Sequence, residues 1–176
     1  MTAGEAFLAR SRYYLAEEYP AKLRKCIAAL PEGAVWERAN DSSNSIGNLL
    51  LHLAGNVRQW IVSGVGGQPV DRDRQAEFAA HDSPDAGMLL ENLESAVSEA
   101  ESVLAGLSEE DLLRPCTIQH RETNVLAAIY HVVEHFAMHT GQIVLLTKAY
   151  SPGAVHFYDD AGSNAAPTWG GREGMR

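Results

Sequence analysis

The chain has 176 residues, of which 45% are hydrophobic and 21% are charged, and its formal net charge is -9. This size and composition predict a single globular domain that buries its own core. The acidic balance, without any run of lysine and arginine, argues against a nucleic-acid partner. No apolar stretch approaches the roughly 20 residues that cross a membrane, and the first residues lack the apolar region of a signal peptide. We therefore expect a cytoplasmic protein without a membrane partner.

The two cysteines, Cys26 and Cys116, are distant in the sequence and form no C-x-x-C pattern, so neither a redox pair nor a zinc knuckle is predicted. Cys26 lies within an apolar helical pattern and is expected to pack as a small apolar side chain. Cys116 and His120 have C-x-x-x-H spacing, which is a weak metal signal without a second pair.

Two helices are predicted in the first third of the chain. Residues 4–30 carry apolar side chains at helical spacing, and Pro20 predicts a kink because an interior proline removes a backbone hydrogen bond. Residues 45–62 form the second predicted helix, in which His52 lies beside the apolar face. Alone, His52 would be interpreted as structural. In a helical bundle, it can become the third ligand for a pair on another helix.

The connection at residues 64–83 is longer than the two to about eight residues usual between bundle helices, and loops of this length are often functional lids. Its charges are interpreted first as a solvated surface. The alternative is that one arginine reaches over a pocket to an anionic group of a substrate. The charged residues are Asp71, Arg72, Asp73, Arg74 and Glu77.

Residues 85–107 form a third predicted helix, because apolar side chains recur through it at helical spacing. No chemistry is visible on this helix. Its acidic residues are expected to face solvent, and they are Glu91, Glu94, Glu99 and Glu101.

Residues 123–150 form the longest predicted helix and carry three histidines at four-residue spacing, His131, His135 and His139. Residues four apart lie on nearly the same helix face, so His135 and His139 can direct imidazole nitrogens at one point. Burying several imidazoles without partners would cost roughly 1 to 3 kcal/mol each, and a shared metal ion removes that cost. The alternative is that the histidines are core residues, each neutral and hydrogen-bonded.

A competing motif lies in the same helix, where His131, Glu134 and His135 form the H-x-x-E-H pattern of inverted zinc peptidases. Such enzymes need a further acidic ligand well downstream, and here the helix end and a tail follow. Glu134 is also rotated by about 100° from His135 around the helix. This offset indicates that the carboxylate of Glu134 either faces solvent or contacts a metal ligand from behind without binding the metal.

Residues 151–176 contain glycine, proline and polar residues without a sustained apolar period, which predicts an irregular tail. Three of its side chains can pack either on the bundle or on a partner subunit, and the sequence does not decide between these. They are His156, Tyr158 and Trp169.

Four long helices without a credible strand predict an all-α four-helix bundle. Three segments, NSIGNLLLHLAGNVRQWI at 44–61, DRDRQAEF at 71–78 and IYHVVEHFAMHTGQI at 129–143, resemble the DinB/YfiT-like superfamily of metal-dependent bacterial enzymes, and within it the DUF1572 branch. The resemblance covers most of the chain up to about Tyr150. It implies an up-down-down-up bundle at residues 1–150, followed by the irregular tail at 151–176.

In that family a histidine on the second helix and an H-x-x-x-H pair on the fourth bind a divalent metal. The resemblance therefore implies a metal site at His52, His135 and His139. Gly141 and Gln142 complete the family's H-x-G-Q ending. His131 is outside this triad, and its role is left open between a residue behind a ligand, a substrate-facing residue and a core residue.

Three neutral imidazoles leave open positions on a metal ion, as in catalytic sites. A zinc or nickel ion held in this way can activate water for hydrolysis or a thiolate for transfer, and the superfamily includes thiol-dependent transferases and isomerases. Copper and iron also suit such a site. The candidates for a general base are Glu77, Glu134 and His131.

The expected partner is a small-molecule substrate, including a low-molecular-weight thiol. Bundles of this kind can also form a homodimer through an apolar helix face. Two alternative functions stay open from the sequence. One is a non-catalytic metal-binding or stress-associated bundle, and the other is a structural bundle whose histidines are core residues.

Overall fold

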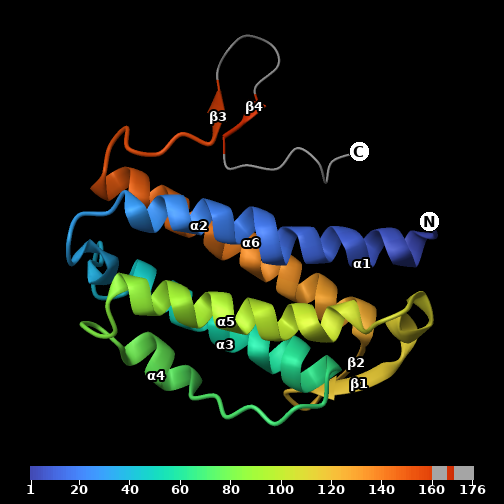
Figure 1. The fold of residues 1–176 in the computed structure, drawn as a ribbon. Helices are drawn as coiled ribbons and strands as arrows, with labels where there is room; N and C mark the ends of the chain where they lie inside the picture. The colour runs from blue at the N-terminus through green and yellow to red at the C-terminus, as the bar shows by residue number, and fades with distance from the viewer. Residues whose placement is uncertain (160–165, 169–176) are drawn as a thin grey trace.

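The protein is a bundle of four long helical units, seen in a computed structural model that describes residues 1–159 and 166–168. α3 and α5 run in one direction, whereas α1, α2 and α6 run in the other (Figure 1). This is the up-down-down-up bundle predicted from the sequence. Among the described helices, none combines the length and the apolarity needed to cross a membrane. The units are α1 (Ala3–Tyr13) with η1 (Tyr14–Glu18) and α2 (Tyr19–Ala28), α3 (Ile46–Val57) with η3 (Arg58–Val65), α5 (Ala86–Ala105), and α6 (Val125–Tyr150).

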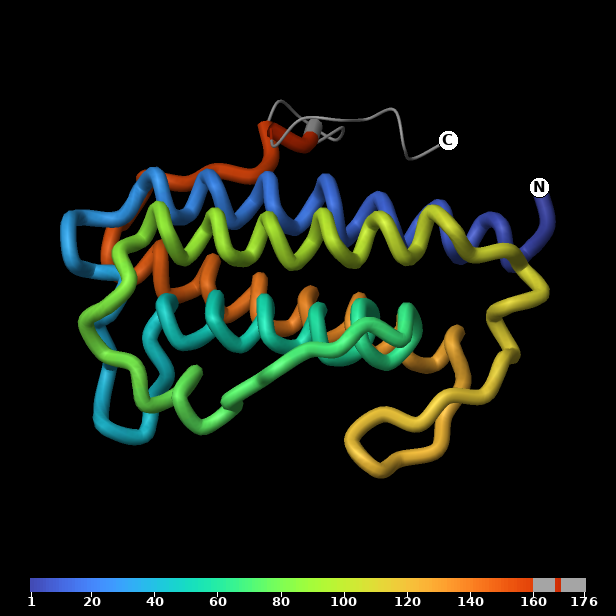
Figure 2. The backbone as a smooth tube through the Cα atoms, turned by 60° about the horizontal axis from the view of Figure 1, so that its bottom comes forward, coloured from blue at the N-terminus to red at the C-terminus, as the bar shows by residue number. Residues whose placement is uncertain are grey.

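Because α3 and α5 run in the same direction, the chain must return along the bundle between them. Residues 66–85 make this return, as the tube in Figure 2 shows. They contain a short helix, α4 (Arg74–Ala79), where only a loop was predicted. Asp73 caps α4, because its side chain accepts a hydrogen bond from the backbone N–H of Ala76. We refer to residues 66–85 below as the return segment.

One apolar core joins the four units. α3 begins with a capping box, in which Ser45 and Asn48 each accept a hydrogen bond from the other's backbone N–H. The largest fully buried side chain is Phe136 of α6, which stacks on Tyr19 with 5.4 Å between ring centroids. Cys26 is fully buried in this core, as predicted, and burial raises the pKa of its thiol.

The first helix is irregular one turn before Pro20. η1 is a π-helical segment, and the backbone N–H of Tyr19 donates to the carbonyl of Tyr14 instead of the residue four earlier. Pro20 then occupies the first turn of α2, where its missing N–H costs little. The irregularity predicted at the proline therefore lies in the turn that precedes it.

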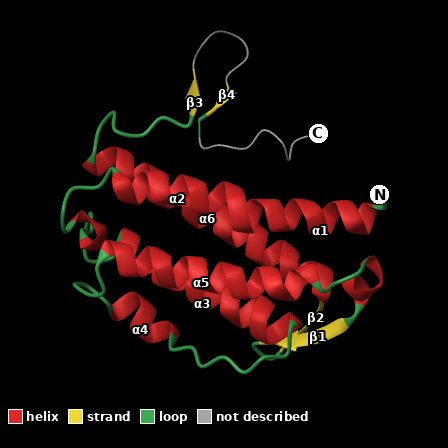
Figure 3. Ribbon diagram, in the orientation of Figure 1, coloured by secondary structure: helices red, strands yellow, loops and turns green. Residues whose placement is uncertain are grey.

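The prediction that the chain has no strand was wrong. β1 (Pro115–Ile118) and β2 (Arg121–Asn124) form an antiparallel hairpin before α6, and Figure 3 shows it as the longer of two strand pairs. Its two turn residues, Gln119 and His120, have φ values of 52° and 62°, the left-handed conformation that two-residue hairpin turns require. Cys116 pairs with Thr123, and in the described part of the chain neither Cys116 nor His120 joins a group able to hold a metal.

The described residues after Tyr150 are irregular, as predicted, apart from a short strand pair. β3 (Tyr158–Asp159) pairs with β4 (Ala166–Pro167). The ammonium group of Lys25 on α2 donates to the carbonyl of Thr168 at 2.6 Å. His156 and Tyr158 are exposed, and Trp169 lies outside the described residues.

Candidate metal centre

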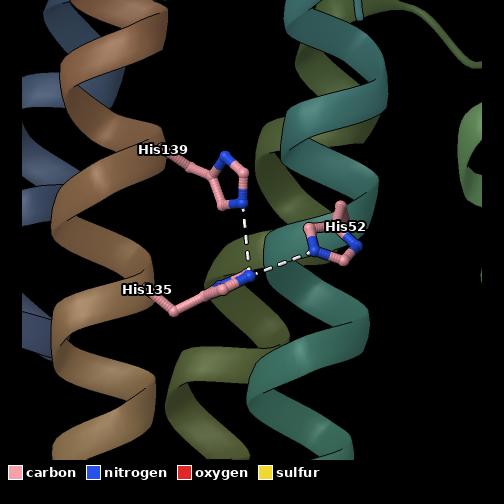
Figure 4. Close-up of side chains that lie close together, drawn as sticks. All are labelled: His52, His135 and His139. Atoms are coloured by element: carbon pink, nitrogen blue, oxygen red, sulfur yellow. Dashed lines mark hydrogen bonds between the residues drawn. The ribbon is translucent and has the colours of Figure 1, made fainter.

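The three histidines of the predicted triad meet in the bundle interior, with His52 on α3 facing His135 and His139 on α6 (Figure 4). The Nε2 atom of His135 lies 3.1 Å from that of His52 and 3.2 Å from that of His139. All three ligand atoms are within 4.8 Å of one another. His52 and His139 are only 5% and 8% exposed, whereas His135 is partly exposed. The antiparallel packing of α3 and α6 therefore brings together residues that are 83 and 87 positions apart in the sequence.

Two of the rings have their outer nitrogens occupied. The Nδ1 of His52 lies 2.9 Å from Oε2 of Glu77, and the Nδ1 of His139 lies 2.7 Å from Oε1 of Gln142. Carboxylate and amide oxygens only accept hydrogen bonds, so we assign the proton of each ring to Nδ1. In the neutral ring this leaves a lone pair on Nε2, directed at the centre of the cluster.

The third ring, that of His135, cannot donate to the Nε2 lone pairs of both His52 and His139. A proton on its Nε2 can be donated to His52 or to His139, but not to both. Its own Nδ1 is buried without a hydrogen-bond partner among the described residues. Burial, followed by the proximity of His139 and His52, lowers the pKa of His135 to about 3, and burial likewise lowers the pKa of His139. Burial therefore favours the neutral form of His135 and of His139, and these rings have too few protons to pair every nitrogen at the centre.

This donor set fits a divalent metal ion. For metal–nitrogen bonds of about 2.0–2.1 Å and tetrahedral angles, two ligand nitrogens are separated by about 3.3 Å. The observed separations of 3.1 and 3.2 Å around His135 are close to that value. One cation would engage the Nε2 atoms of all three rings, whereas a proton on His135 can pair with only one of the other two, so the residues present could hold a metal ion.

The interpretation of residues 71–77 as a solvated surface was wrong for two of them. The side chains of Arg72 and Glu77 are only 7% and 9% exposed and form a buried ion pair next to His52. Arg72 donates from Nε to Oε1 of Glu77 at 2.6 Å and from Nη2 to Oε2 at 2.9 Å. Burial alone would raise the pKa of Glu77, but the hydrogen bonds from His52 and Arg72 outweigh it and lower that pKa.

The candidates for a general base occupy different places. Glu77 lies behind His52, on the side away from the shared centre, and Glu134 is exposed on the outer face of α6. His131 lies beside the cluster, with its ring centroid 5.4 Å from that of His135 and 4.2 Å from that of Trp60. Burial lowers the pKa of His131, although Glu134 opposes this effect. Of the three candidates, only His131 has the position of a group that could meet a substrate.

The inverted zinc peptidase motif is not assembled. The carboxylate of Glu134 faces solvent, so it does not lie with His131 and His135 around one point. The group of side chains that could hold a metal ion instead includes His52 from another helix.

Sequence reasoning missed Arg72 and Gly55. Gly55 is one turn after His52 on α3, and a Cβ atom there would lie 2.1 Å from Oε1 of Glu77 and 2.7 Å from Nε of Arg72. A glycine inside a helix, three residues after a histidine, was the signal that something packs against that helix face.

The bundle is similar in fold to solved structures of DinB-like proteins. A DinB-like protein from Bacillus cereus superposes with a TM-score of 0.61 at 15% identity, covering 78% of this chain and 91% of that one. The DinB-like protein YjoA from Bacillus subtilis gives 0.60 at 14% identity, covering 80% and 90%. At such identities the likeness shows the fold alone.

The chain belongs to the DUF1572 family, described as proteins of unknown function, whose sequence profile matches residues 3–156. The resemblance predicted from the three segments is thereby confirmed. Among curated proteins, no significant match was found.

Proposed function

We propose that this protein is a metal-dependent enzyme in which His52, His135 and His139 hold one divalent ion that activates water or a thiol. The reaction would be a hydrolysis or a thiol S-transfer on a small molecule. The observation that carries the proposal is the convergence of three Nε2 atoms with too few protons to pair them. Neutral nitrogen donors suit zinc or nickel.

A bound ion of this kind lowers the pKa of coordinated water or stabilises a thiolate at neutral pH. Among the described residues, three side chains would act as ligands, which leaves room for a substrate or water as in other catalytic sites. Because His135 is the most exposed of the three, a substrate would approach past this ring. His131 and Trp60 border that approach and would orient the substrate.

The metal proposal is tested by elemental analysis of protein purified without a histidine tag. We expect about one zinc or nickel per chain in wild type, and loss of the metal in His52→Ala and in His135→Ala. His120→Ala, which removes an exposed histidine of the hairpin turn, serves as the control and should keep the metal. Wild type that takes up neither metal would contradict the proposal.

The enzymatic part is tested by a substrate panel with the metal-loaded protein. We expect metal-dependent turnover either of activated esters or of a low-molecular-weight thiol with an electrophile, and the reacting class separates hydrolase from transferase. A protein that holds stoichiometric metal but reacts with no member of either panel would instead be a non-catalytic metal-binding bundle. Homodimer formation and the cytoplasmic location stay predictions.

A further inference from the structure

The return segment is fastened to α3 at the level of the metal centre. Asn48, which is fully buried, donates from Nδ2 to the carbonyls of Glu77 and Ala80 at 2.9 and 2.8 Å. Arg38 donates to the same carbonyl of Ala80 at 2.9 Å. The ring of Phe78 packs on His52 with 4.8 Å between centroids. The backbone around α4 is therefore held in place independently of the side chain of Glu77.

From this fixed backbone, the carboxylate of Glu77 reaches the outer nitrogen of His52. Arg72 occupies both carboxylate oxygens and also donates from Nη1 to Oε1 of Gln59 at 2.5 Å. Arg72 and Glu77 together carry no net charge, so the ion pair does not require a positively charged imidazole as a further partner. A lone pair on Nδ1 would instead face a carboxylate oxygen at 2.9 Å, which is repulsive. Among the described residues, the one donor near that nitrogen is Nη2 of Arg72 at 3.1 Å, and this group already donates to Oε2 of Glu77 at the shorter distance of 2.9 Å.

We propose that Glu77, locked by Arg72, is a positioning residue that fixes the proton of His52 on Nδ1 and so presents the Nε2 lone pair to the metal centre. This inference rests on the proposed function. Glu77 is not itself a ligand, because it contacts the ring nitrogen opposite to the one that faces His135. The return segment thus orients a metal ligand and does not merely cover the site.

The three rings differ in this respect. From Nδ1, His52 donates to a carboxylate and His139 to an amide oxygen, whereas Nδ1 of His135 has no hydrogen-bond partner among the described residues. A carboxylate acceptor makes the opposite nitrogen more basic, and such acceptors behind metal-bound histidines are typically worth about 10- to 100-fold in metal affinity. We expect His52 to depend most on the residue behind it.

Gly55 gives the positioning role a test that leaves every charge in place. A Cβ atom at this position would overlap Oε1 of Glu77, and the flexible carboxylate must then move away from His52. Within a helix, the change from glycine to alanine by itself favours folding. Gly55→Ala therefore displaces the buried ion pair while keeping both of its charges, and thermal unfolding reports the structural cost separately from zinc affinity.

The experiment measures zinc affinity by competition with a chelator, together with the imidazole tautomers of the zinc-free protein by long-range proton–nitrogen NMR. The variants are Gly55→Ala and the double variant Arg72→Leu with Glu77→Leu, which removes both buried charges at once. The matched control is Arg58→Leu with Glu99→Leu, the same substitutions at an ion pair far from the histidines. Circular dichroism and thermal unfolding show whether each variant is folded.

We expect wild type to carry the His52 proton on Nδ1, and both test variants to bind zinc at least about tenfold more weakly while the control binds like wild type. In the double variant the proton should move to Nε2. Folded variants that bind zinc as tightly as a zinc-binding wild type, or a wild type with the proton on Nε2, would overturn the positioning role alone. A wild type that binds no zinc or nickel overturns the proposed function as well, so the two failures are distinguishable.

Discussion

Two arginine–glutamate pairs of similar geometry occupy opposite environments in this molecule. Arg72 and Glu77 are 7% and 9% exposed and adjoin His52, whereas Arg58 and Glu99, which join η3 to α5, are 23% and 39% exposed. Two hydrogen bonds link Arg72 to Glu77, and three link Arg58 to Glu99. Desolvation of a buried pair offsets much of its attraction, so stability alone does not explain Arg72 and Glu77. Their position behind a candidate metal ligand does.

The largest effect is expected when one partner of each pair is removed. Arg72→Ala leaves Glu77 buried without its counter-charge, which should lower the free energy of unfolding by about 3–5 kcal/mol. Arg58→Ala affects a partly exposed pair and should cost less than about 1 kcal/mol. Urea denaturation of both variants measures the difference. Equal losses would show that burial does not separate the two pairs.

Metal binding should stabilise the fold, and this gain should depend on the histidine centre but not on the pair of Arg58 and Glu99. At free zinc about 100-fold above the dissociation constant, the free energy of unfolding should rise by about 2.7 kcal/mol, and a chelator should reverse the gain. The Arg58 and Glu99 double leucine variant should keep this gain, whereas His135→Ala should lose it. Thermal unfolding with and without zinc tests the prediction, and an equal gain in His135→Ala would contradict it.

Asn48 ties the buried pair to the rest of the bundle. In Asn48→Ala the carbonyls of Glu77 and Ala80 lose a buried donor, which should cost about 1–3 kcal/mol. The same variant should speed amide hydrogen exchange in residues 73–81 more than in α5. Unchanged exchange in α4 would mean that other contacts hold the return segment. Ser95→Ala, which removes a hydroxyl donor to Glu99, is the matched control and should leave α4 unchanged.

Sequence patterns predicted most of the helical architecture, because a helical period is a local property. The i, i+4 spacing of His135 and His139 maps directly onto one face of α6. The partnership with His52 is not local, and it was predicted through family resemblance. The hairpin was missed because its strands have only four residues each and its turn, Gln119 and His120, lacks the Asn-Gly signature of such turns.

The return segment shows where sequence reasoning stops. Its charge-rich residues have the composition of a solvated surface, and no periodicity distinguishes Arg72 from Arg74. In the structure Arg72 is buried in the ion pair, whereas Arg74 is exposed and lies over the ring of Phe78. Only the path of the backbone along α3 makes this distinction, and that path depends on tertiary contacts such as those of Asn48.

The smallest predicted effect is the pH dependence of the exposed pair. The hydrogen bond from Arg58 is the main cause that lowers the pKa of Glu99, with burial opposing it. A lowered pKa means that the folded state favours the ionised carboxylate. The stabilisation is therefore complete above the unfolded pKa of about 4.3 and is lost as the pH falls through the lower folded value.

Glu99 is too exposed for this contribution to exceed about 1 kcal/mol. The difference in unfolding free energy between wild type and Glu99→Gln should be constant near neutral pH and should shrink to zero in acid. Urea denaturation across this range measures it, and added salt should reduce it because the pair is screened. A difference that grows as the pH falls would have the wrong sign. It would mean that the carboxylate is destabilised in the folded protein, contrary to its contact with Arg58.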